Sequence, residues 1–142
     1  MSRRNARQGR WPLHLMRTAA VLVLLDTLAQ AALAGLFVTG DLDLLTWHSA
    51  NADALAALTL VQAASALVVR WRLAGPVWPV GASVLLTVLV GAQQALGEAR
   101  ILAGHLPLAM AIFGLATGLT YWTWTFNPAA ADAREAKAEV TK

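Results

Sequence analysis

The sequence contains no cysteine, and only 13% of its 142 residues are charged. Without cysteine the chain can form no disulfide, thiolate metal site, cysteine nucleophile or iron–sulfur cluster. Any redox chemistry must therefore depend on a bound cofactor. The low charge and the 58% share of hydrophobic residues lie far from the average of soluble domains, and they indicate that water is not the main solvent of this chain.

Four apolar runs are long enough to cross a bilayer, which takes about 20 residues at about 1.5 Å per residue. Their length and their lack of two-residue alternation predict helices rather than a barrel. Because the connections are short, neighbouring helices are expected to be antiparallel. The expected fold class is an all-α membrane protein, an antiparallel four-helix transmembrane bundle. The predicted spans are approximately Thr18 to Val38, Ala50 to Val69, Val77 to Leu96 and Leu106 to Thr125.

Positive charge gathers on one side of the predicted spans. Arginine and lysine residues occur before the first span, between the second and third, and after the fourth, whereas the opposite side has Arg100 alone with three acids. By the positive-inside rule both termini are expected in the cytoplasm, and a multi-pass position in the cell inner (plasma) membrane is predicted. The net charge of +3 comes from these flanking residues, so the lipid bilayer is an expected partner and nucleic acid is not.

The chain then divides into three parts. Residues 1–17 form a basic cytoplasmic lead-in, residues 18–125 the transmembrane domain, and residues 126–142 a cytoplasmic tail. The tail is rich in alanine and charge from Pro128 to Lys142, and its glutamates are spaced one helical turn apart, which predicts a surface helix without an assigned function.

Two histidines occupy corresponding places in the sequence. His48 is at the outer start of the second helix and His105 at the outer start of the fourth. In an up-down bundle these two helices run in the same direction and are diagonal neighbours, with axes roughly 12 to 14 Å apart. That separation suits two histidines that bind an iron from opposite sides, as in a haem site. The alternative is that both are interfacial residues, which is the expected role of His14 in the lead-in.

The helix faces that carry the two histidines are small and polar. From His48 the helical period passes Asn51 and Gln62, and from His105 it passes Ala109. Small residues leave room for a flat ring, but membrane helices also use them for ordinary packing. The residues expected to contribute to a cofactor pocket, besides the histidines, are Gln30, Gln62 and Gln93.

A weak internal repeat relates the two halves of the chain. Residues 30–35 close the first helix and residues 93–97 close the third, each with the pattern Gln-x-x-Leu-small, and each is followed by an outer loop and a histidine. Repeated helix pairs around a shared site are a familiar membrane architecture. The alternative is chance, because two short matches arise easily in so biased a composition.

The repeat belongs to a wider pattern, which comprises Gln30, Leu33, Gly35, Val38, Thr39, Gly40 and His48, and then Gln93, Leu96, Gly97, Ile101, His105 and Ala109. Over roughly Leu25 to Tyr121 this pattern resembles one four-helix half of a haem A synthase, an enzyme of the cytochrome oxidase assembly family. That family is built from two such halves, each with two histidines at these positions. The resemblance implies that His48 and His105 are axial haem ligands.

The departures from that family also matter. Leu45 stands where the catalytic half has a glutamate three residues before its first histidine, the outer-loop cysteine pair of some members is absent, and a homodimer or another chain would have to supply the second half. Haem methyl oxidation is therefore not expected, whereas binding of a b-type haem is. The remaining roles are electron transfer, haem handling or oxidase assembly. No set of residues for oxygen activation or hydrolysis is evident, so the isolated chain is not expected to be an enzyme; if it is one, it is a haem-dependent oxidoreductase.

Asp26 lies near the middle of the first span, where an unsatisfied carboxylate costs about 2.5–3.5 kcal/mol on insertion scales. It is expected to face inward, with Gln30 as a partner one turn along the helix. Asp26 is either a proton or cation site or a protonated acid bonded to a neighbouring helix. The first case leads to a second hypothesis, a small proton-coupled transporter resembling the small multidrug-resistance proteins. A third hypothesis is an accessory membrane subunit without chemistry.

Overall fold

The computed structural model describes residues 9–128, and all regular structure in that range is helical. Each of its four helices is long and apolar enough to cross a membrane by length and composition, which confirms the prediction of an all-helical chain with four such helices. The first residues of the predicted lead-in (1–8) and most of the predicted tail helix (129–142) lie outside the described residues. The helices are α2 (Trp11–Val38), α3 (Leu44–Leu73), α4 (Trp78–Glu98) and α5 (Leu102–Thr125).

The first two helices begin before the apolar runs that predicted them. α2 begins at Trp11, inside the predicted lead-in, because Pro12 suits the first turn of a helix and because Leu13 and Met16 are buried against the bundle. α3 begins at Leu44 rather than near residue 50. Its first turns mix apolar residues with polar ones such as Thr46, Ser49 and Asn51, which lowers their hydropathy but does not prevent a helix.

Pro107 lies inside α5, beyond its first turn, because this helix begins at Leu102. Proline has no backbone N–H, so the carbonyl of Ala103, four residues earlier, lacks the hydrogen bond that residue 107 would otherwise donate to it. α5 therefore has one gap in its backbone ladder, one turn from its start.

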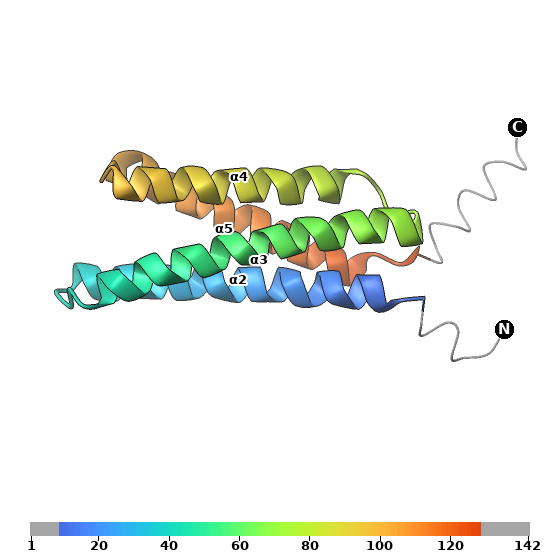
Figure 1. Cartoon of the computed structure of the whole chain (residues 1–142), viewed down its shortest axis with the longest axis horizontal. Helices are drawn as coiled ribbons and strands as arrows, with labels where there is room; N and C mark the ends of the chain where they lie inside the picture. Colours follow the sequence, from blue (N-terminus) through green and yellow to red (C-terminus); the bar gives the residue numbers. More distant parts are fainter. Residues whose placement is uncertain (1–8, 129–142) are drawn as a thin grey trace, which may run out of the picture.

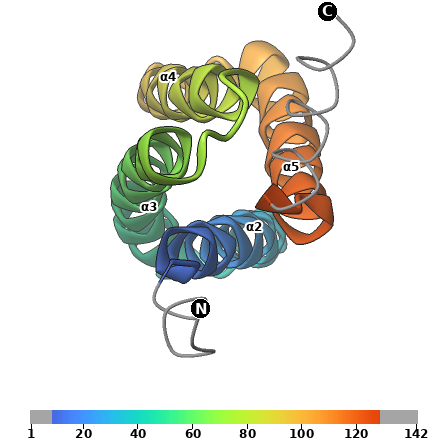
Figure 2. The same ribbon diagram turned by 90° about the vertical axis from the view of Figure 1, so that its right-hand side faces the viewer.

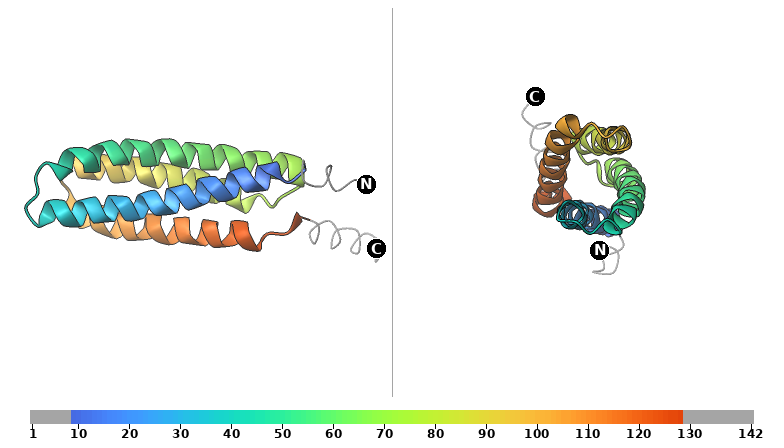
Figure 3. Two further views of the ribbon diagram at one scale, coloured as in Figure 1. Left: turned by 90° about the horizontal axis from the view of Figure 1, so that it is seen from below. Right: turned by 90° about the vertical axis from the view of Figure 1, so that its left-hand side faces the viewer.

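The four helices lie side by side as a bundle (Figure 1). Views along the bundle show α2 next to α3 and α5, and α4 next to the same two helices (Figures 2 and 3). The helices that carry His48 and His105, α3 and α5, are therefore diagonal.

The two ends of the bundle differ in composition. The α2–α3 and α4–α5 connections lie at one end, called the histidine end here because His48 and His105 are close to it (Figure 1). The start of α2, the α3–α4 connection and the end of α5 lie at the opposite end. This second end is called the arginine end, after Arg10, Arg17, Arg70 and Arg72.

Buried side chains from all four helices build the central core, and Val23, Leu55, Leu86 and Leu119 are among those that pack in one apolar cluster. Other leucines, such as Leu85, are exposed on the outside of the bundle, as expected for a surface that faces lipid. Inside a membrane the apolar interior and the lipid are chemically alike. Close packing of the buried set therefore stabilises the bundle more than removal from water does.

Two adjacent leucines provide a test of this packing. Leu86→Ala is expected to lower the free energy of unfolding by about 2–5 kcal/mol, because the side chain is fully buried and its loss leaves a cavity. Leu85→Ala, at a position that is 50% exposed, is expected to change it by no more than about 0.5 kcal/mol. Chemical unfolding of both variants in detergent micelles measures the difference. Equal losses would contradict the packing described here.

Candidate functional site

The imidazole rings of His48 and His105 face each other at the histidine end of the bundle. Their centroids are 6.5 Å apart, and their planes are inclined by 51°. His48 lies in the second turn of α3 and His105 in the first turn of α5, and both side chains are half-buried. The structure thus brings together two rings that are far apart in the sequence and that lie on diagonal helices.

The His105 ring is oriented by α4. Its Nδ1 lies 3.0 Å from the backbone oxygen of Gln93, a carbonyl that can only accept, so Nδ1 carries the proton and donates. In the neutral ring the lone pair is then on Nε2. The approach depends on Gly97, because a Cβ at that position would lie 3.1 Å from Cε1 and 3.3 Å from Nδ1 of His105.

The His48 ring is contacted by α2. The Gln30 side-chain amide donates to the backbone oxygen of His48 at 3.0 Å and lies 3.4 Å from its Nε2. Because an amide nitrogen donates only, Nε2 of His48 is the acceptor in this contact. Nδ1 is buried and has no hydrogen-bond partner among residues 9–128. A buried polar atom without a partner is uncommon and marks a place where a ligand or a water is expected.

Asn51 links Asp26 to this arrangement. Its amide donates to the Gln30 side-chain oxygen at 2.9 Å and lies 3.4 Å from a carboxylate oxygen of Asp26. The bond to the oxygen of Gln30 fixes the orientation of that amide, so its nitrogen points to His48. Gln30, the expected partner of Asp26, is therefore joined to it through Asn51. The sequence offered one signal for Asn51, its place one turn after His48 on the same helix face.

The three predicted glutamines have different places. Gln30 and Gln93 both lie at the histidine pair, Gln30 through its side chain and Gln93 through its backbone carbonyl. The side-chain oxygen of Gln93 is buried without a partner in the described part of the chain. Gln62 is also buried, and neither of its amide atoms has a partner there. It lies about 21 Å from His48 along the α3 axis, so the structure does not bring it to the pair.

Two imidazoles at this separation can bind one metal between them. A metal–imidazole bond is about 2.0–2.1 Å long, so two rings on opposite sides of one metal have centroids about 6.3 Å apart. The observed 6.5 Å is close to that distance. The inclination is compatible, because each ring can rotate about its own metal–nitrogen bond.

A haem iron takes four ligands from its macrocycle and needs two from the protein. Within residues 9–128 no group of three or more His, Asp or Glu side chains is arranged to hold a bare metal ion. The donor set, two neutral imidazoles of which one is already oriented by a carbonyl, is the type found at haem iron. The residues present therefore fit this group.

Comparisons with family models, with curated proteins and with solved structures gave no match to this chain.

The role of Gly97 can be tested without any cofactor. In Gly97→Ala the new methyl group forces the His105 ring to shift by a few tenths of an ångström and weakens its hydrogen bond to Gln93. We expect an altered ¹⁵N shift of Nδ1 in histidine-labelled protein and a loss of about 1 kcal/mol in the free energy of unfolding. Gly91→Ala on the same helix is the control, since a Cβ there meets nothing within 4 Å. An unchanged His105 signal in Gly97→Ala would refute the contact.

Proposed function

We propose that this chain is a haem-binding integral membrane protein in which His48 and His105 are the axial ligands of one haem. The observation that carries the proposal is the 6.5 Å separation of the two rings. The hydrogen bond of His105 to Gln93 adds support, because a histidine that binds a metal usually donates its other N–H to a carbonyl or carboxylate. Such a bond fixes both the tautomer and the orientation of the ring.

The residues around the pair have separate tasks. Gly97 has no side chain, so the His105 ring can pack against α4. The backbone oxygen of Gln93 accepts from Nδ1 of this ring and leaves Nε2 available for a metal. On the other side, iron binding by Nε2 of His48 requires this atom to give up its 3.4 Å contact with Gln30, whose shorter bond to the His48 carbonyl holds α2 against α3. A haem held by both imidazoles would supply electron transfer rather than oxygen chemistry.

The resemblance to half of a haem A synthase supports a role in electron transfer, haem handling or oxidase assembly, with a haem of the b type. Leu45, at the position of the family's glutamate, is 49% exposed and brings no carboxylate to the pair. Oxidation of a haem methyl group is therefore not part of the proposal. A second copy of this chain, or another protein, would supply the second half.

The proposed setting is the cell inner membrane, with an antiparallel bundle and both termini in the cytoplasm. The charge distribution supports this orientation. Among residues 9–128, the histidine end has three acidic residues, Asp41, Asp43 and Glu98, with Arg100 as its one basic residue, whereas the charged residues described at the arginine end are all arginines. Positive charge is retained on the cytoplasmic side. The haem would then lie near the outer face.

A small proton-coupled transporter that uses Asp26 is the second candidate. One observation favours it: Asp26 is a half-buried carboxyl group in the middle of α2, whose nearest described partner is the amide of Asn51 at 3.4 Å. Asn51 also bonds Gln30, which contacts His48. The same hydrogen bonds connect Asp26 to the edge of the histidine site, which gives this carboxyl group a structural role. We therefore prefer the haem proposal.

Absorption spectroscopy of detergent-purified protein tests the haem proposal. The protein is expected to show a Soret band and, after reduction, sharp α and β bands, because two imidazoles give a low-spin iron. His48→Ala and His105→Ala are each expected to abolish these bands. His14→Ala, which removes a histidine at the opposite end of the bundle, should leave them unchanged. A protein that stays colourless after haem supplementation would rule out the proposal.

The orientation can be measured with single cysteines, because the natural chain has none. Leu42→Cys and Val77→Cys place a thiol in connections at opposite ends of the bundle, at positions that are 71% and 65% exposed. A membrane-impermeant maleimide is expected to label Leu42→Cys in intact cells, and to label Val77→Cys only after the membrane is opened. The reverse pattern would invert the proposed topology.

A further inference from the structure

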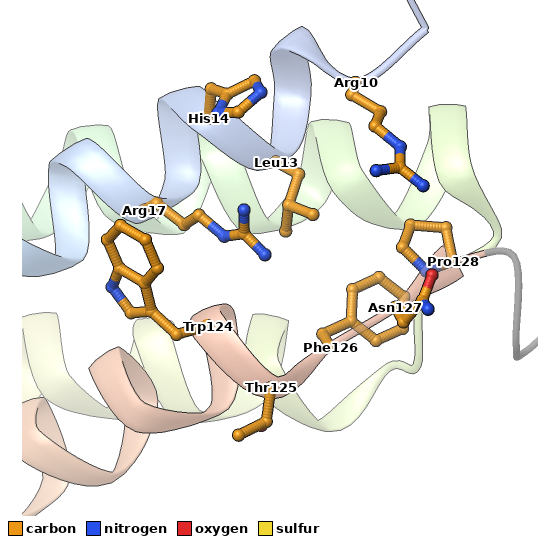
Figure 4. Close-up of a pocket in the computed structure, with 9 residues that line it drawn as sticks. All are labelled: Arg10, Leu13, His14, Arg17, Trp124, Thr125, Phe126, Asn127 and Pro128. Atoms are coloured by element: carbon orange, nitrogen blue, oxygen red, sulfur yellow. The ribbon is translucent and has the colours of Figure 1, made fainter. Parts of the chain in front are cut away.

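A second candidate site lies at the arginine end, far from the histidine pair. The first turns of α2 and the segment that follows α5 enclose a cavity of about 370 Å³. Ligand pockets typically have volumes of about 300–1,000 Å³, so this cavity is large enough for a small polar group. Figure 4 shows the guanidinium groups of Arg10 and Arg17 reaching from α2 into this space, with Leu13 between them.

Arg17 is held in place by the protein. Its Nε donates to the backbone oxygen of Thr123 at 2.8 Å, and its guanidinium lies 5.1 Å from the centre of the Trp124 ring. Both contacts fix the planar group, so its terminal N–H groups are presented to the cavity at little further cost in side-chain entropy. Arg17 is half-buried, which makes an unpaired charge at this position costly.

No carboxylate in the described part of the chain neutralises this charge. Every acidic residue in that range lies at or beyond the middle of the bundle, toward the histidine end: Asp26, Asp41, Asp43, Asp53 and Glu98. Neither Arg10 nor Arg17 forms an ion pair with any of them. Two guanidinium groups that point into one cavity, one of them fixed, are suited to an anion with several oxygens, because the guanidinium fork matches phosphate geometry.

The other residues of the cavity indicate where that anion comes from. Trp124 and Phe126 line it together with Leu13, so apolar surface lies beside the two charges. Trp11 and Trp78 are at the same end and are about half exposed, as is typical of side chains at the level of lipid headgroups. Basic pockets between transmembrane helices on the cytoplasmic side bind anionic headgroups.

We propose that this cavity binds the phosphate headgroup of an anionic phospholipid, with Arg17 and Arg10 as the phosphate ligands and Phe126 against the start of the acyl chains. The assignment to the cytoplasmic leaflet rests on the proposed orientation of the bundle. The site itself depends neither on that orientation nor on haem binding. A specifically bound lipid would join the start of α2 to the segment after α5.

Native mass spectrometry of the full chain released from detergent tests the lipid site. Phosphatidylglycerol is titrated against phosphatidylcholine, which has the same phosphate but no net charge, and against inorganic phosphate. The wild-type protein is expected to bind phosphatidylglycerol at least about tenfold more tightly than phosphatidylcholine. Arg17→Gln and Arg10→Gln are each expected to weaken phosphatidylglycerol binding about tenfold, because each removes charge-assisted hydrogen bonds.

Arg70→Gln and Arg72→Gln are the matched controls, since both remove an exposed arginine at the same end but outside the cavity. They should change phosphatidylglycerol binding by less than about twofold, because neither lines the cavity. Circular dichroism shows whether each variant keeps its helices, and Arg10→Gln provides the test if Arg17→Gln does not fold.

Equal binding by the cavity variants and the wild type would overturn the proposal, as would an absence of preference for the anionic lipid. Inorganic phosphate that binds as tightly as phosphatidylglycerol would reassign the cavity to free phosphate. Haem absorbance, read on the same samples, reports the other proposal independently.

Discussion

In each helical hairpin of the bundle, a hydrogen bond at the histidine end joins the two helices, and the histidine of that hairpin takes part in it. In the α2–α3 hairpin the Gln30 amide donates to the backbone of His48, and in the α4–α5 hairpin the His105 ring donates to the backbone of Gln93. Hydrogen bonds of this kind are among the few specific forces between helices in an apolar medium, where the lipid competes equally well for apolar contacts. The distance between the two rings depends on both hydrogen bonds. The same two bonds therefore hold the helices of each hairpin together and set the geometry of the candidate site.

The repeat seen in the sequence acquires a physical meaning from these contacts. Gln30 and Gln93 begin the two copies of Gln-x-x-Leu-small, and in the folded chain each is beside the histidine that follows it. The chemistry is not the same in both halves, since one glutamine uses its side chain and the other its backbone. The two halves thus place their rings in equivalent positions while orienting them differently: Nδ1 of His105 is hydrogen-bonded, whereas Nδ1 of His48 has no partner among residues 9–128.

The sequence predicted the four helices well because a membrane span is a one-dimensional property, a run of apolar residues of sufficient length. It predicted their ends less well, since the first turns of α3 are helical although polar residues interrupt their apolar sequence. The proximity of His48 and His105 follows from the order and direction of the helices, and both can be read from the positions of the apolar runs in the sequence. The role of Gly97 does not follow, because it depends on how closely two helices approach. Gln62 shows the limit of periodicity: it shares a helix face with His48 but lies about 21 Å away along the axis.

Pro107 makes the two histidine-bearing turns mechanically unequal. The Ala103 carbonyl has no N–H from Pro107 to bond, so α5 can bend next to His105 without breaking a backbone hydrogen bond. α3 contains no proline, and His48 lies in a helix with an unbroken ladder. The backbone that carries His105 is therefore easier to bend than the backbone that carries His48. A change in the distance between the two rings would therefore be taken up in the first turn of α5.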